Sequence, residues 1–193
     1  MSRKRPRTDI PEQIQGHARE MAEHGTQMMD VGNWAQAQQA WESVLEDVPD
    51  SAYAFNKLGV CFAQMDELEQ AEAAFRKALE NEPQMSQALS NLGNIELSRG
   101  NAQQAADLYE EAIRYQPDYS VAHHNLAAAY RKLGKIDKSV AQIKKARSIE
   151  SRSSVDMRGY PAIDKSEPKR GFGGCLFWLI VLAAMVAILV LLR

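Results

Sequence analysis

A spacing of 34 residues recurs through the middle of the chain in several residue types at once. Gly25, Gly59 and Gly93 share this spacing, and Ala127 holds the next position of the same column. Three further columns keep the same phase: Ala37, Ala71 and Ala105 with Ser139; Trp41, Phe75 and Tyr109 with Ile143; and Pro49, Pro83 and Pro117 with Ser151. Four columns in phase indicate an internal repeat of one supersecondary unit.

Each unit divides into two helix-length halves. The break falls seven residues after the first small residue, at Gly32, Asp66, Gly100 and Gly134. Small residues let two helices approach closely, and the aromatic residue one turn after the alanine is expected to fill the space between units. The prolines end the second helix, because proline cannot continue a helix interior. A single pair cannot bury its own apolar face, so the units must stack, which predicts an all-α solenoid.

These residues resemble the tetratricopeptide repeat, a helix–turn–helix unit with Gly, Ala, aromatic and Pro landmarks. The best match runs from Asn91 to Pro117, whereas the first and last units depart from the pattern. The resemblance implies a right-handed solenoid over residues 11–151, with units at about 18–51, 52–85, 86–119 and 120–151. Because Ile10 and Pro11 stand in a sequence typical of a helix start, the first helix is expected to begin there.

The resemblance also implies that the first helix of each unit lines a concave groove that binds a protein or peptide. Helical spacing from the glycine column predicts these groove residues: Arg19, Thr26, Tyr53, Asn56, Gln87, Asn91, Asn94, His124, Asn125 and Arg131. Asn91 and Asn125 resemble an asparagine ladder that holds a ligand's backbone; alternatively, they satisfy neighbouring helix ends. Capture of a C-terminal carboxylate is not expected, because Ser90 stands where related arrays place a lysine.

The sequence predicts no catalytic activity, no metal and no cofactor. It contains no phosphate-binding glycine loop, no nucleophile elbow and no Cys/His cluster with metal spacing. His123 and His124 are adjacent, so on a helix they point about 100° apart and cannot share one metal ion. We expect His123 to pack and His124 to face the groove.

Charge is distributed unevenly along the units. Residues 18–119 carry six basic and 18 acidic residues, a balance of −12, whereas residues 120–150 carry seven basic and two acidic residues, a balance of +5. Two interpretations stay open for the basic end. The last helix is either a solvated cap, which a solenoid needs, or a surface attracted to anionic lipid headgroups.

The C-terminal part of the chain differs in kind from the repeats. Residues 175–192 are 18 consecutive apolar residues, which as a helix would be about 27 Å long. We therefore expect a transmembrane helix, and Lys169 and Arg170 before it favour a single-pass protein with its repeats on the cytoplasmic side. Ala183 and Ala187 form a small-xxx-small pair that favours weak self-association.

Two segments join these parts. Serine, proline and glycine residues predict a flexible linker over 152–174. Residues 1–10 are a basic arm expected to be disordered, and a membrane anchor argues against nucleic acid as its partner.

The leading functional hypothesis is a non-enzymatic, membrane-anchored scaffold that recruits a protein partner through the concave face. The alternative is an accessory subunit of a membrane assembly complex, such as pilus, secretion or photosynthetic machinery, held partly through its tail. A third class is the non-catalytic arm of an enzyme complex.

Overall fold

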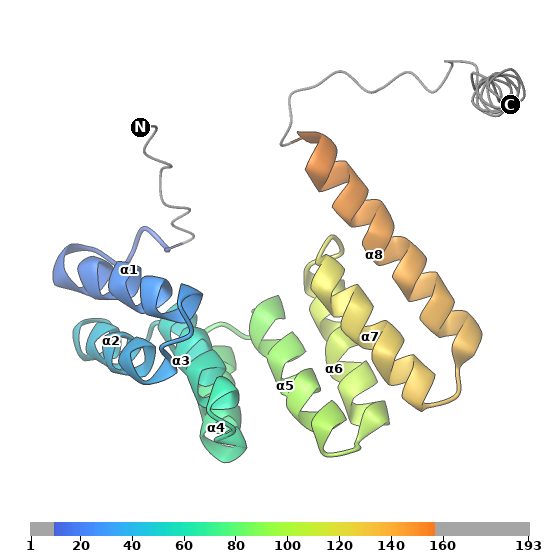
Figure 1. Ribbon diagram of the computed structural model, residues 1–193, viewed down its shortest axis with the longest axis horizontal. Coiled ribbons are helices and arrows are strands. Elements are labelled where there is room, and N and C mark those ends of the chain that lie inside the picture. Colours follow the sequence, from blue (N-terminus) through green and yellow to red (C-terminus); the bar gives the residue numbers. More distant parts are fainter. Residues whose placement is uncertain (1–9, 157–193) are drawn as a thin grey trace, which may run out of the picture. The chain divides into compact units, whose positions relative to one another are not determined.

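The computed structural model describes residues 10–156, which form eight α-helices and no strand (Figure 1). The helices are α1 (Gly16–Asp30), α2 (Trp34–Asp47), α3 (Ala52–Gln64), α4 (Leu68–Asn81), α5 (Ser86–Ser98), α6 (Ala102–Tyr115), α7 (Ser120–Lys132) and α8 (Ile136–Asp156). The most extensive packing joins α1 with α2, α3 with α4, α5 with α6 and α7 with α8. The all-helical class predicted from the repeat is therefore confirmed for the described residues.

The turn inside each pair depends on one residue in the left-handed backbone region. Its φ angles are 75°, 65°, 89° and 73° at Gly32, Asp66, Gly100 and Gly134. Asp66 is the one non-glycine residue with positive φ among the described residues. The next residue donates its backbone N–H to a carbonyl five residues earlier, as Asn101 does to Glu96 at 2.9 Å. This bond closes the helix end, so the predicted breaks are helix C-caps.

The glycine column is explained by the aromatic column of the same unit. A Cβ atom added at Gly93 would lie 2.5 Å from the ring of Tyr109, and one at Gly59 would lie 2.6 Å from the ring of Phe75. Each ring therefore packs directly on the backbone of the first helix. Phe75 also packs with Leu92 and Ile95 of the following unit, which confirms that the aromatic residue fills the space between units.

The first helices also meet one another. Besides the contacts between chain neighbours, α3 contacts α5, and α5 contacts α7. The packing of α4 against α5 is sparser than the packing of α2 against α3 or of α6 against α7. Helices α3, α5 and α7 therefore lie side by side along one face, although the junction between units two and three is the thinnest of the array.

The two helices at the ends differ from expectation. The helix start predicted at Ile10 and Pro11 is wrong, because α1 begins at Gly16 and a turn precedes it, in which Ile14 donates its N–H to the O of Pro11 at 3.1 Å. Ile10 and Ile14 are buried in the turn against the core of unit one. At the other end, α8 continues to Asp156, five residues beyond the predicted end of the array.

Among residues 10–156, no helix is long and apolar enough to cross a membrane. The predicted transmembrane run 175–192 lies outside the described residues, as do residues 1–9 and most of the predicted linker.

Candidate partner-binding face

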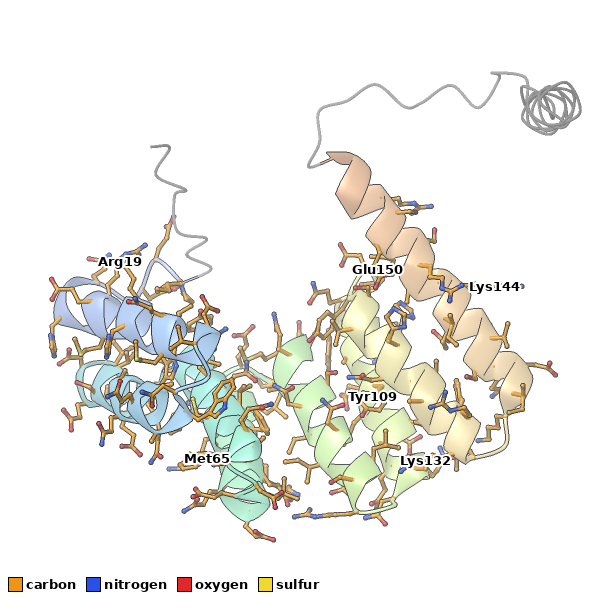
Figure 2. The ribbon with its side chains drawn as sticks, in the orientation of Figure 1. Arg19, Met65, Tyr109, Lys132, Lys144 and Glu150 are labelled. Atoms are coloured by element: carbon orange, nitrogen blue, oxygen red, sulfur yellow. The ribbon has the colours of Figure 1, made fainter. Side chains whose placement is uncertain are left out.

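The predicted groove residues lie on α1, α3, α5 and α7, and we call the surface of these four helices the first-helix face. Arg19 and Thr26 come from α1, Tyr53 and Asn56 from α3, Gln87, Asn91 and Asn94 from α5, and His124, Asn125 and Arg131 from α7. Figure 2 shows the side chains over the helices, with Arg19 at the α1 end. The structure places the groove residues on successive first helices, and their part in binding stays a prediction.

Asparagine side chains connect the first helices of units two, three and four. Asn91 donates from Nδ2 to Oδ1 of Asn56 at 3.0 Å, which joins α5 to α3. Asn125 donates from Nδ2 to Oδ1 of Asn94 at 3.0 Å and to Oγ of Ser90 at 3.3 Å, which joins α7 to α5. The asparagines therefore bind side chains of the neighbouring first helix rather than helix ends. An amide has two N–H donors and two lone pairs on its oxygen, so Asn91, Asn94 and Asn125 retain capacity for a ligand, whereas Asn56 is buried.

Tyr109 links this polar row to the core. Its ring is buried on Gly93, and its hydroxyl donates to Oδ1 of Asn94 at 2.7 Å. Burial raises the pKa of the Tyr109 phenol, so the group remains a neutral donor near neutral pH. The Oδ1 atom of Asn94 therefore accepts hydrogen bonds from both Tyr109 and Asn125, which fixes the orientation of the amide.

An aromatic group lies at the junction of units one and two. The rings of Tyr53 and Trp41 meet edge to face, with centroids 5.6 Å apart and planes at 73°. Trp41 donates from Nε1 to the sulfur of Met29 at 3.3 Å, and Lys57 places Nζ 5.2 Å from the centre of the Tyr53 ring. Half-buried Tyr53 therefore offers a fixed apolar surface beside a cation on the first-helix face.

The remaining groove residues differ in how far their polar groups are already engaged. Thr26 donates from Oγ1 to the O of Ala22 at 2.8 Å, and Arg19 pairs with Glu23 at 3.3 Å. Gln87 and Arg131 are exposed. The α1 and α7 ends of the face therefore present charge, and its centre presents amides.

The adjacent histidines point to different places, as expected. His123 is buried, with Nδ1 2.6 Å from Oε1 of Gln142 and Nε2 3.1 Å from the O of Pro117. His124 is exposed, and its Nε2 lies 2.9 Å from Oε1 of Glu150 on α8. Within the described part of the chain, no three or more His, Cys, Asp or Glu side chains are grouped as a metal site would require.

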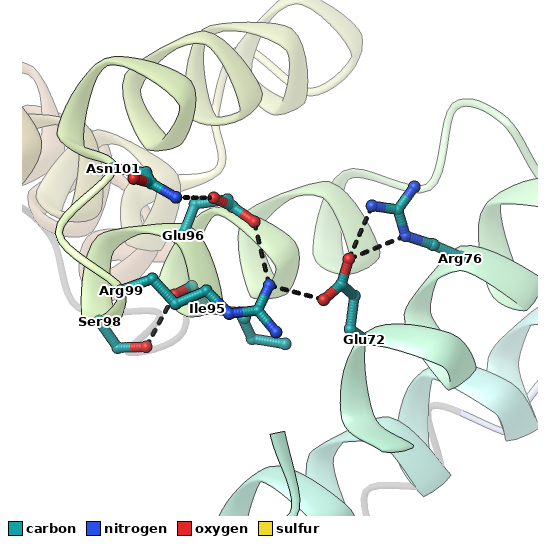
Figure 3. Close-up of polar contacts among 7 residues, drawn as sticks. All are labelled: Glu72, Arg76, Ile95, Glu96, Ser98, Arg99 and Asn101. Atoms are coloured by element: carbon teal, nitrogen blue, oxygen red, sulfur yellow. Dashed lines mark hydrogen bonds and ion pairs between the residues drawn. The ribbon is translucent and has the colours of Figure 1, made fainter. Parts of the chain in front are cut away.

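A charge cluster between α4 and α5 was not predicted from the sequence (Figure 3). Glu72 accepts from Arg76 Nη2 and from Arg99 Nη1, each at 2.6 Å, and Arg99 also lies 3.3 Å from Glu96. The bond from Arg76, followed by that from Arg99, lowers the pKa of the Glu72 carboxyl. One sequence signal could have pointed to this cluster. Glu72 is acidic, whereas the equivalent position 34 residues later is the buried Ala106. The cluster bridges the junction where packing is sparse.

Several solved structures share this architecture. A crystal structure of MamA matches with a TM-score of 0.61 and 25% identity over 72% of this chain and 81% of that chain. A pilF structure from Pseudomonas aeruginosa has a TM-score of 0.65 with 23% identity, over 70% of this chain and 62% of that one. An O-GlcNAc transferase mutant from Thermobaculum terrenum has a TM-score of 0.56 and 24% identity, over 59% of this chain and 22% of that one.

No curated protein sequence is similar enough to this chain to count as a relative. Profiles described as tetratricopeptide repeat match residues 24–86, 64–120 and 96–154, which together run from within α1 into α8. The columns of small and aromatic residues, the turn glycines and the whole of helices α2 to α7 lie inside these matches. The chain therefore belongs to the tetratricopeptide repeat family.

Proposed function

We propose that the array recruits a protein or peptide through the first-helix face and that residues 175–192 hold the chain on the cytoplasmic side of a membrane. Tetratricopeptide repeats indicate a protein–protein interaction scaffold. The finer proposal, which names the face and the anchor, rests on two separate features of the chain.

The observation that carries the recruiting face is the asparagine row across α3, α5 and α7. Its side chains are held in place by their neighbours, with donors and acceptors left over for the backbone of an extended ligand. Ligand groups that meet a preorganised row lose less entropy on binding than they would on a mobile surface. Ser90 is almost fully buried and uncharged, so the ligand's backbone amides, rather than a terminal carboxylate, are the expected target.

Replacement of exposed face residues tests this proposal without disturbing the row itself. The double variant Gln87→Ala with Arg131→Ala should reduce recovery of the bound protein when the full chain is affinity-purified from membranes. The matched control is Gln39→Ala with Arg114→Ala, which changes exposed residues on the second helices. Equal recovery from both variants would place the binding surface elsewhere.

The anchor rests on the 18-residue apolar run, which lies outside the described residues. Full-length chain should float with lipid vesicles in a density gradient and resist extraction at high salt. A chain that ends at Lys169 separates the two functional hypotheses. A recruiter should still bind its partner in solution, whereas a membrane-complex subunit held through its tail should lose it.

A further inference from the structure

The last helix retains apolar residues where a solenoid end is expected to be polar. In unit three, Ala102 and Ala106 are 8% and 0% exposed. The residues 34 positions later are Ile136 and Val140, which are larger, apolar, and 56% and 44% exposed. The same column is therefore core in unit three and open surface on α8.

These two residues belong to one stripe of α8. Ile136, Val140, Lys144 and Arg147 follow one another at helical spacing, and all are exposed. An adjacent side of α8 packs on α7, where Ser139 is buried and donates from Oγ to the O of Ala127 at 2.8 Å. Figure 2 shows Lys144 on the side of α8 away from α7 and Glu150 on the side toward it. We call Ile136, Val140, Lys144 and Arg147 the end face.

Charge around the end face is predominantly positive. Lys138 and Lys145 are exposed on another side of α8, where Lys138 Nζ lies 5.4 Å from the centre of the Tyr130 ring, and Asp137 is the acidic residue beside the end face. A second acid of the helix, Glu150, is engaged with His124. Within residues 10–156, neither Lys144 nor Arg147 has a carboxylate within ion-pair distance. Two aliphatic side chains among unpaired cations are typical of a surface that rests on anionic lipid headgroups.

The chain after α8 keeps such a surface close to a bilayer, a point that rests on the proposed anchor. Eighteen residues, 157–174, separate α8 from the apolar run, and they include Lys165, Lys169 and Arg170. As the linker predicted from the sequence, a segment of that length would have an r.m.s. reach of about 23 Å. A second copy is a poorer occupant, because α8 against α8 would bring cations together.

We propose that the end face of α8 docks on an anionic lipid surface, with Ile136 and Val140 entering the headgroup layer and Lys144 and Arg147 binding lipid phosphates. Docking would turn a loosely tethered array into one with a defined orientation, with α8 against the membrane.

The test uses the full chain with an environment-sensitive fluorophore on the end face. The label is attached to Ile136→Cys in a Cys175→Ser background. Cys61 does not compete, because it is buried and burial raises the pKa of its thiol to about 11. A matched label at exposed Gln27→Cys on α1 reports on the opposite end of the array. Vesicles contain phosphatidylcholine alone or with phosphatidylglycerol.

Docking predicts a blue shift at position 136 with phosphatidylglycerol vesicles only, reversed by about 0.5 M salt, and none at position 27. The variant Lys144→Glu with Arg147→Glu should lower the docked fraction about tenfold or more, because each cation contributes to binding. The control Lys77→Glu with Arg114→Glu changes the net charge equally and should leave the shift unchanged.

The outcomes separate docking from anchoring. Flotation with phosphatidylcholine vesicles but no shift at position 136 with either lipid would overturn docking and leave the anchor in place. Flotation only with phosphatidylglycerol, abolished by the double reversal, would support docking and overturn the anchor. A shift that is independent of lipid charge and increases with protein concentration would show a protein occupant, and docking on lipid would be wrong.

Discussion

At the N-terminal end of the array, exposed Glu20 and His24 take the positions at which the next unit buries Ala54 and Leu58. At the C-terminal end, by contrast, the exposed positions keep large apolar residues, Ile136 and Val140. A solenoid unit contacts only its neighbours, so the same column is core when a unit stands beside it and surface when none does. The N-terminal end is closed by polar substitution, whereas the C-terminal end retains a surface for docking.

The strongest test of this comparison exchanges residues between an end and the interior. Leu58→His should lower the free energy of unfolding by about 3 kcal/mol, because it removes apolar contacts and buries an imidazole without a partner. His24→Leu should change it by less than about 0.5 kcal/mol, because the position is exposed. Urea unfolding followed by circular dichroism measures both. Similar losses would show that position 24 is also core.

The glycine column offers a second contrast between the interior and the C-terminal end. Gly93→Ala should lower the free energy of unfolding by about 2 kcal/mol, because its Cβ would lie 2.5 Å from the Tyr109 ring. At the equivalent position of unit four, the chain already carries Ala127, and Ile143 replaces the ring. Ala127→Gly should cost only about 0.5–1 kcal/mol through helix entropy. A smaller loss for Gly93→Ala than for Ala127→Gly would contradict the packing explanation.

Asp66 distinguishes the turn of unit two from the turns of the two end units. Because Asp66 has φ of 65° where Gly32 and Gly134 stand in those units, Asp66→Gly should stabilise the array by about 0.5 kcal/mol. Asp66→Ala, the matched variant, should destabilise it by a similar or larger amount. Thermal unfolding of the three proteins should give the stability ranking Gly, Asp, Ala, and a wild-type chain more stable than the glycine variant would show that side-chain contacts of Asp66 outweigh backbone strain.

The Glu72 cluster should give the smallest and the most pH-dependent effect. Its folded pKa is lowered, so the carboxylate stabilises the array above its unfolded pKa of about 4.3, and this contribution is lost as pH falls through the folded value. At pH 7, Glu72→Gln should cost a few tenths of a kcal/mol to about 1 kcal/mol, because the pairs are partly solvated. Unfolding at pH 7 and near pH 3 should show the difference shrinking. A constant difference would remove the charge explanation of this junction.

Residue columns were enough to predict the helix pairs, the turns and the packed aromatic rings. They did not predict the start of α1, because the signal at Pro11 resembles a helix start while Ile10 and Ile14 are held as a turn by the core of unit one. Nor did they predict where α8 ends, since Asp156 lies beyond the last repeat position. Boundaries at the array ends lack the neighbouring unit that defines them in the interior.

The candidate face was predicted as a set of positions, but its bonding was not. Helical spacing placed Asn91 and Asn125 on first helices, whereas their acceptors, Asn56 and Asn94, became evident only when adjacent helices were in place. The same holds for Arg99, whose carboxylate partner lies 27 residues away in the previous unit.

The repeat pattern was enough to predict a stack of helix pairs, because each landmark residue acts within one unit or on the next unit along the chain. The side chains that bond across units and the faces that stay open became evident only from the packing of the helices. A position is buried or open according to whether a neighbouring helix covers it, and the repeat pattern is the same for covered and uncovered positions. Ala106 and Val140 share one column, yet only Ala106 is covered.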